Sequence, residues 1–269
     1  PALARRTFLR GLGLAAVAGL ACKRRAAGEG AQGRQGRAAE VPRRELGLTG
    51  VQVSVVGLGG YHVGKVAGEA ESVRLVRAAI DRGVTFLDNS WDYHGGRSEE
   101  RVGRALRDGY RQRAFVMTKV DGRTARSAAA QLEQSLRRLG VDVIDLVQIH
   151  EVIRSDDPQR CFAEDGCIHA LVEAKRAGKV RFLGFTGHKD PALHLSMLKA
   201  AAANGFSFDT VQLPLNVMDA HFRSFEKRVL PELVKEGAGV IGMKALGDGR
   251  ILTSRTASAV ECLHYAMNL

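Results

Sequence analysis

From residue 51 onward, short apolar runs alternate with longer segments in which apolar residues recur at helical spacing. The short runs have the length of buried strands, and the longer segments have that of amphipathic helices. Paired in chain order, the predicted strands and helices are 53–58 and 69–82, 85–87 and 98–106, 114–118 and 124–139, 143–149 and 165–177, 180–185 and 191–203, 210–213 and 222–236, and 239–243 with a helix from 256. Repeated strand–helix units predict parallel strands joined by right-handed crossovers.

Two architectures use such units, an open doubly wound sheet and a closed (β/α)8 barrel. An open nucleotide-binding sheet usually carries G-x-G-x-x-G after its first strand, whereas Gly57-Leu58-Gly59-Gly60 lacks the third glycine, and we expect it to enter a loop. Polar residues at the ends of several strands also favour the barrel, because barrel enzymes build their sites there. We therefore predict an α/β chain folded as a (β/α)8 TIM barrel, with the eighth unit missing from this chain.

The length of the chain and the distribution of its charge favour one globular domain that does not bind nucleic acid. A chain of 269 residues with 45% hydrophobic content can bury one large core. The formal net charge is +11, but ten Lys/Arg and three Asp/Glu in residues 1–50 account for +7 of it. The rest of the chain is nearly balanced and lacks the basic face with aromatic partners that nucleic-acid binding requires. We predict no nucleic-acid partner, and the oligomeric state stays open.

Residues 1–22 have the composition of an export signal. Arg5-Arg6 precede a weakly apolar run at 11–21 that is too short to span a bilayer, and paired arginines resemble the twin-arginine type. We expect export to the periplasm, with a lipid anchor at Cys22 as an option and no further membrane segment. If this interpretation is wrong, the protein is cytoplasmic. The composition of residues 23–43 predicts a flexible tether. We expect residues 44–269 to form the barrel domain.

Four ionisable side chains of four kinds follow neighbouring strands. Asp88 and Tyr93 come after the strand at 85–87, Lys119 ends the next strand and His150 ends the one after. Adjacent parallel strands lie about 4.8 Å apart, so these groups can meet. We expect Lys119 to make the Tyr93 phenol more acidic, Asp88 to hold Lys119, and His150 to orient a substrate oxygen. Such a set suits proton delivery to a carbonyl, with hydride from a nicotinamide or flavin.

Several segments together resemble the aldo-keto reductases. They are Leu46-Gly47-Leu48-Thr49-Gly50, Gly57-Leu58-Gly59-Gly60, the stretch 88–99, Thr118-Lys119 and Gln148-Ile149-His150. The resemblance covers residues 44–269. It implies an NAD(P)H-dependent oxidoreductase that reduces a small aldehyde or ketone to an alcohol. It further implies catalytic roles for Asp88, for Tyr93 as general acid, for Lys119 and for His150.

The resemblance also implies a site for NADP(H) or NAD(H), of which we favour NADP(H). Gln212 resembles the residue that holds the nicotinamide carboxamide, and residues 244–249 resemble the loop near the pyrophosphate. The implied cofactor-binding residues are Gly60, Asp88, Thr186, Gly187, Gln212, Lys244, Leu246 and Gly247. Leu215 or its neighbour stands where the family usually has a stacking Tyr, which predicts weaker or differently oriented cofactor binding.

Tyr61 and Trp91 fall in loops over the same barrel mouth. These aromatic side chains are candidates for lining the substrate pocket, and packing within a lid is the alternative. Asp156-Asp157, in the longer connection after His150, is expected to form a solvated turn.

Two other functions stay open. A metal-dependent hydrolase on the same barrel would use His62, His94, His150 and several carboxylates at strand ends, but the first strand offers no ligand to close such a site, so we predict no metal. A non-catalytic nicotinamide-binding subunit that senses redox state for a partner is the other alternative. The presence of all four catalytic-type residues argues for chemistry instead.

Overall fold

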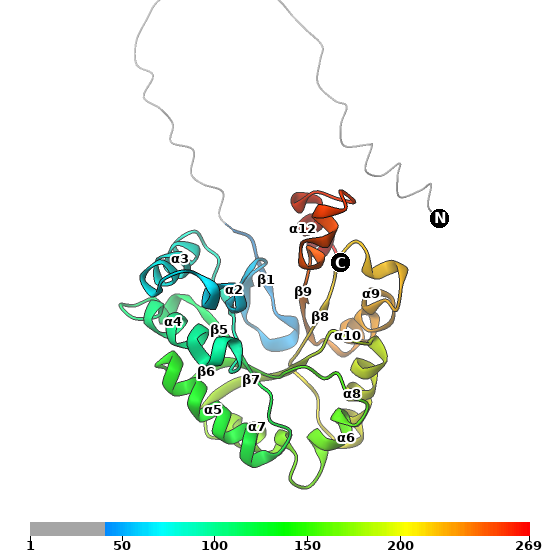
Figure 1. Cartoon of the computed structure of the whole chain (residues 1–269). Coiled ribbons are helices and arrows are strands. Elements are labelled where there is room, and N and C mark those ends of the chain that lie inside the picture. The colour runs from blue at the N-terminus through cyan, green and yellow to red at the C-terminus, as the bar shows by residue number, and fades with distance from the viewer. Residues whose placement is uncertain (1–40) are drawn as a thin grey trace, which may run out of the picture. The chain divides into compact units, whose positions relative to one another are not determined.

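The computed structural model describes residues 41–269, and a parallel sheet lies at their centre. Its strands are β3 (Gly57–Gly59), β4 (Phe86–Asp88), β5 (Phe115–Val120), β6 (Ile144–Ile149), β7 (Val180–Thr186), β8 (Thr210–Pro214) and β9 (Gly239–Met243). Each strand is hydrogen-bonded to the next in chain order, so β3 and β9 are the two edges. The sheet curls with helices along its outer side (Figure 1). This arrangement confirms the predicted architecture as an incomplete (β/α)8 barrel with seven parallel strands in the described residues.

Helices and short 3-10 turns connect the strands. The helices are α2 (Gly60–Lys65), α3 (Glu69–Asp81), α4 (Arg97–Ala105), α5 (Ala125–Leu139), α6 (Asp157–Phe162), α7 (Cys167–Arg176), α8 (Pro191–Ala203), α9 (Phe225–Arg228), α10 (Leu230–Glu236), α11 (Arg250–Thr253) and α12 (Ala259–Met267). The 3-10 turns are η1 (Gly47–Thr49), η2 (Tyr93–Gly96), η3 (Arg111–Arg113), η4 (Asp219–His221) and η5 (Gly247–Gly249). The helix predicted at 222–236 is divided into α9 and α10, because Pro231 suits the first turn of a new helix but cannot continue an old one.

An antiparallel hairpin of β1 (Arg43–Glu45) and β2 (Gln52–Ser54) covers the N-terminal ends of the barrel strands. The Ser54 hydroxyl accepts hydrogen bonds from the backbone amides of Thr85 and Phe86, at the start of β4. Apolar residues of the hairpin and of the strand starts form one buried cluster, made of Leu46, Val53, Phe86, Phe115, Met117 and Leu146. The opposite end of the barrel carries the predicted site.

The run predicted as one strand at 53–58 is two strands, one in the hairpin and one in the barrel. Gly57 aligns with Phe86 in the parallel sheet. The chain does not enter the expected loop after β3 but begins α2 directly at Gly60, where a Cβ atom would lie only 2.7 Å from Oδ1 of Asn89. The prediction failed because an apolar run does not reveal that its two halves pair with different partners.

Alternation along β5 turns Lys119 into the barrel. Met117 belongs to the inner cluster, whereas Val116 belongs to the cluster between sheet and helices. Thr118 also faces the helices, because its hydroxyl donates to Glu99 of α4 at 2.6 Å. Since side chains alternate between the two faces of a strand, Lys119 shares the inner face with Met117. The strand thus brings an amine to the C-terminal end of the barrel interior.

The predicted export signal at 1–22, the lipid-anchor candidate Cys22 and residues 23–40 of the predicted tether lie outside the described residues. The described chain enters β1 at Arg43, the last residue of that tether. Within residues 41–269, none of the helices has the length and apolar content needed to cross a bilayer.

Candidate active site

Lys119 lies at the centre of the candidate site. Its Nζ donates to Oδ1 of Asp88, at the end of β4, and to the backbone oxygen of Asn89 at 2.7 Å. The same nitrogen is 3.4 Å from the hydroxyl of Tyr93 and 5.0 Å from the centroid of its ring. Lys119 is therefore within hydrogen-bond reach of two other predicted catalytic side chains, Asp88 and Tyr93.

The Asp88 carboxylate keeps Lys119 charged although only 2% of the lysine is exposed. Burial by itself lowers the pKa of Lys119, but Asp88 and the Tyr93 hydroxyl oppose burial, and the net pKa is raised above 10.5. An ammonium ion thus stands beside Tyr93 at neutral pH.

Tyr93 holds its proton more firmly than the sequence predicted. Burial raises the pKa of the phenol above its ordinary 10.0, Lys119 lowers it by less, and Asp88 raises it further. The net direction is opposite to the predicted acidification: Lys119 limits an upward shift that burial causes. Tyr93 is consequently a neutral phenol that carries its proton at neutral pH.

His150 completes the group from the end of β6. Its ring lies edge-on to the ring of Tyr93, with the two centroids 5.9 Å apart. Its Nδ1 lies 2.8 Å from Oδ1 of Asp121, a residue that the sequence reasoning missed. Asp121 follows Lys119 by two positions, so the alternation that turns Lys119 inward was the available signal.

Gln212 and Thr186 carry buried polar atoms that have no hydrogen-bond partner within residues 41–269. Nε2 of Gln212 donates to Oδ2 of Asp88 at 2.6 Å, which leaves its Oε1 unpaired, and Oγ1 of Thr186 is unpaired as well. The two residues are register partners on β7 and β8. Buried polar atoms without partners are costly, and a carboxamide offers both a donor and an acceptor. These residues therefore fit a nicotinamide carboxamide at the strand ends.

The two other predicted cofactor residues near the strand ends are glycines with packing reasons of their own. A Cβ atom at Gly187 would lie 2.5 Å from the backbone oxygen of Val152, and one at Gly60 would meet Asn89. Leu215, where a stacking aromatic was expected, is buried in the apolar cluster between sheet and helices. The structure thus gives Leu215 ordinary barrel packing.

The predicted phosphate loop follows β9 as a tight turn. Lys244 and Gly247 both have a φ of +55°, and the amide of Gly247 donates to the backbone oxygen of Lys244 at 2.8 Å. Leu246 is half-buried within this turn. The pKa of His188 is lowered, first by burial and then by the charges of Lys244 and His150. Because β6 and β9 run in the same direction in a parallel sheet, the loop after β9 lies at the same end of the barrel as His150.

Of the two predicted substrate residues, the structure brings only Tyr61 to Tyr93. Their rings meet edge-to-face with centroids 5.5 Å apart. Trp91 is tied to the outer layer instead: its Nε1 donates to Gln134 of α5 at 2.8 Å, and Arg138 lies over its ring. Trp91 therefore anchors its loop to α5.

Of the three histidines named for the metal-hydrolase alternative, only His150 lies in a group that could hold a cation within the described residues. Nε2 of His94 lies 2.8 Å from the backbone oxygen of Tyr61, and His62 packs against the Tyr61 ring. In the described part of the chain, a triad of His, Cys or acidic side chains close enough to share a cation forms only from Asp92, Asp121 and His150.

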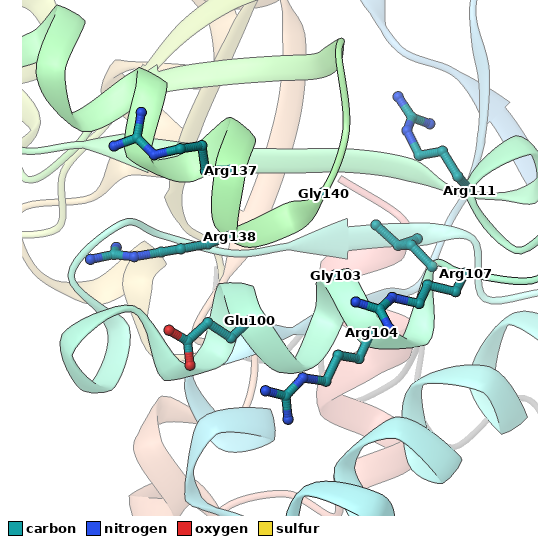
Figure 2. A pocket seen from close by; sticks show the side chains of 9 residues that line it. Glu100, Gly103, Arg104, Arg107, Arg111, Arg137, Arg138 and Gly140 are labelled. Atoms are coloured by element: carbon teal, nitrogen blue, oxygen red, sulfur yellow. The ribbon is translucent and has the colours of Figure 1, made fainter.

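A cavity of about 420 Å³ lies in the outer layer, between α4 and α5 (Figure 2). Two of its arginines are tied into the fold, because Arg138 pairs with Glu99 and Arg111 pairs with Asp145. Its lining residues are Glu100, Gly103, Arg104, Leu106, Arg107, Arg111, Arg137, Arg138 and Gly140. None of them is a predicted site residue, so we do not assign the chemistry to this cavity.

Comparison with known proteins gives a consistent result. The model of the aldo/keto reductase family matches residues 55–261. The chain is 30% identical to aldo-keto reductase YhdN of Bacillus subtilis (strain 168), over 68% of this chain and 55% of the relative. It is 29% identical to L-galactose dehydrogenase of Arabidopsis thaliana, over 78% of this chain and 67% of the relative. Thus the chain spans about half to two thirds of these relatives' length.

Comparison with a solved structure also points to this family. The fold is similar to that of the holo form of aldo-keto reductase AKR11C1 from Bacillus halodurans, with a TM-score of 0.66 and 25% identity. The match covers 78% of this chain and 68% of the other.

Proposed function

Because this chain belongs to the aldo/keto reductase family, a family of oxidoreductases, we propose that it reduces an aldehyde or ketone to an alcohol with NADPH or NADH. The observation that carries the proposal is the buried Lys119 ammonium, which contacts both the Asp88 carboxylate and the Tyr93 phenol. A protonated phenol beside a buried ammonium can deliver its proton to an oxygen that gains negative charge.

The four side chains divide the proton chemistry among them. Tyr93 keeps its proton at neutral pH, because its pKa is raised by burial, and gives it to the substrate oxygen as that oxygen becomes basic. Lys119 then stabilises the phenolate that remains, and Asp88 holds Lys119 in place. His150 orients the substrate oxygen beside Tyr93. When bound, the nicotinamide supplies the hydride that no side chain can provide.

We assign the carboxamide of the nicotinamide to Gln212 and Thr186, because their buried polar atoms lack partners within residues 41–269. The turn at 244–249 is proposed to face the phosphates. Tyr61, which packs on Tyr93, is proposed to contact the substrate. We favour NADP(H) over NAD(H).

The substrate is proposed to be a small carbonyl compound. One relative is named for the oxidation of a sugar, L-galactose, which supports the inclusion of sugars beside simple aldehydes and ketones. The test is a purified-enzyme screen that follows the loss of absorbance of reduced nicotinamide across these three classes. A titration that finds no binding of NADPH or NADH would overturn the proposal, whichever substrates are tried.

We also propose that residues 1–22 direct export by a twin-arginine route. That route carries folded proteins, so the barrel would capture its nicotinamide before export. Cell fractionation tests this proposal, and a full-length protein with an uncleaved signal in the cytoplasm would contradict it.

A further inference from the structure

The Nδ1 atom of His150 is surrounded by hydrogen-bond acceptors. Oδ1 of Asp121 lies 2.8 Å from it, Oγ of Ser90 lies 3.2 Å from it, and Oδ1 of Asp92 lies 3.5 Å from it. The Ser90 hydroxyl donates its own proton to Asp92 at 2.5 Å, so towards His150 it can only accept. With the carboxylates ionised, a proton on Nδ1 makes the 2.8 Å contact with Asp121 a hydrogen bond, whereas a bare Nδ1 would set two lone pairs against each other.

We propose that Asp121 is a positioning residue that fixes the proton of His150 on Nδ1 and so decides what Nε2 can do. This inference rests on the proposed carbonyl reduction for its catalytic meaning, but the position of the proton is a property of the protein alone. The shortest of the three contacts is the one to Asp121.

A proton fixed on Nδ1 leaves Nε2 of the neutral ring as an acceptor. In that form, Nε2 can accept a hydrogen bond from the hydroxyl of an alcohol product. It cannot donate one to a carbonyl oxygen. Donation from Nε2 to the carbonyl requires a second proton on the ring. Asp121 therefore makes Nε2 of the neutral ring an acceptor, which suits the hydroxyl of an alcohol and not a carbonyl oxygen.

Asp121 is itself held in place from two sides. Its backbone amide and that of Gly122 both donate to Oε1 of Gln131 on α5, at 2.8 Å. Nη1 of Arg123 donates to the Asp121 backbone oxygen at 2.9 Å. The carboxylate is thus carried by a fixed turn at the end of β5.

The other charged groups around His150 do not supply the Nδ1 contact. The Tyr93 ring lies edge-on, and Arg123 reaches only the backbone oxygen of His150, at 2.6 Å. Within residues 41–269, no hydrogen bond joins His188 to His150. Asp92 and Asp121 are therefore the groups that set the tautomer.

Two-bond proton–nitrogen NMR correlations of histidine rings test the proposal directly. The full chain, with its eight histidines labelled with ¹⁵N in the ring, would be recorded near neutral pH, and a His150→Gln variant assigns the signal. We expect neutral His150 to carry its proton on Nδ1, and Asp121→Ala to move the ring towards a mixture of tautomers. A proton found on Nε2 in the parent protein would overturn the proposal.

A control with a chelator distinguishes a proton on Nδ1 from a bound cation, since Asp92, Asp121 and His150 could also share an ion. The spectrum should be the same before and after EDTA treatment. A His150 signal that changes on chelation would mean that a cation occupies Nδ1, which contradicts the proposal. Because neither spectrum involves turnover, these outcomes are independent of whether carbonyl reduction itself is correct.

Kinetics then distinguish positioning from simple structural support. Asp121→Ala should lower kcat for oxidation of the alcohol on the order of a hundredfold, because Nε2 is no longer held as the acceptor for the alcohol hydroxyl, with little change in KM for the cofactor. Asp121→Asn keeps an acceptor oxygen and should recover part of that loss. Asp142→Asn, at an exposed position, is the matched control and should behave as the parent. Equal activity of Asp121→Ala and the control would refute the positioning role.

Discussion

The side-chain amide of Gln212 donates to the carboxylate of Asp88 at 2.6 Å, although 124 residues separate them in the chain. The other oxygen of the same carboxylate accepts from Lys119. One aspartate at the end of β4 is therefore fixed by two strands of the barrel, and it links the ammonium ion beside Tyr93 to the amide that we assign to the nicotinamide.

This link predicts that Gln212→Ala weakens cofactor binding. The variant removes the proposed acceptor for the carboxamide and one donor to Asp88, a loss of about 1.5 kcal/mol, which corresponds to about a tenfold higher Kd. Fluorescence titration with NADPH measures it. Gln159→Ala, at an exposed position on α6, is the control. An unchanged Kd in Gln212→Ala would remove Gln212 from the cofactor site.

Lys119→Met should raise the pKa of Tyr93 further. Burial already raises that pKa, and Lys119 is the main group that lowers it, so its removal leaves the upward causes unopposed. Tyrosinate absorbance during alkaline titration, with the Tyr93→Phe spectrum subtracted, would show Tyr93 ionising at higher pH than in the parent. Carbonyl reduction should fall at least about a hundredfold. Ionisation at lower pH would contradict the electrostatic account.

Asp157→Asn should destabilise the fold. Asp157 is buried, its Oδ1 accepts from Nε of Arg123 at 2.9 Å, and its Oδ2 accepts from the amides of Ile153 and Arg154. Removing one partner of a buried ion pair costs about 3–5 kcal/mol. Denaturant unfolding at pH 7 measures this loss. The neighbouring Asp156→Asn, at an exposed position, is the matched control and should change stability little.

The same aspartate predicts that the free energy of unfolding of the parent protein falls at acid pH, which we call the acid limb of its stability curve. Burial by itself raises the pKa of Asp157, but Arg123 and the two backbone amides outweigh burial, and the net pKa is lowered below 3.8. A lowered folded-state pKa gives stability that is present above 3.8 and is lost as pH falls through the lower value. Asp157→Asn should flatten this limb, and an equally steep limb in the variant would contradict the assignment.

Gly96→Ala should destabilise more than Gly109→Ala. Both glycines have a positive φ, of 92° and 84°, so both variants carry backbone strain of about 1 kcal/mol. A Cβ atom at Gly96 would also lie 2.2 Å from Cζ of Arg138, whereas the one at Gly109 meets open space. Displacing Arg138 leaves the buried Glu99 carboxylate without its ion pair, at a further cost of about 2 kcal/mol or more. Equal unfolding free energies for the two variants would contradict the steric argument.

The strand order was predictable, because strand–helix repetition is a local pattern. The side chains that face inward at the strand ends were predictable too, because period-two alternation is also local. Lys119 and His150 were expected to end buried strands, and in the structure Lys119 is the residue before the last of β5 and His150 directly follows β6. The hairpin was not predictable, because nothing local in 53–58 reveals that Val53 pairs across to Arg44 while Gly57 pairs with Phe86.

The direction of pKa shifts and the burial of charged side chains were the features that the sequence predicted least well. The direction of the Tyr93 pKa shift depends on how deeply the loop after β4 is buried, and spacing along the chain does not contain this quantity. Asp157, expected in a solvated turn, is fully buried because Arg123 reaches it from the end of β5. Both differences arise from contacts between segments far apart in the chain.

The most direct test of the proposed chemistry is the rate of carbonyl reduction by Tyr93→Phe, measured with the cofactor Kd on the same preparation. The account predicts a fall of about a hundredfold or more with the cofactor Kd nearly unchanged, because the variant loses only the proton that Tyr93 delivers. Tyr110→Phe, whose hydroxyl donates to Asp81 in the outer helical layer, is the matched control and should retain activity. Turnover by Tyr93→Phe equal to that of the control would contradict the assignment of Tyr93 as the acid.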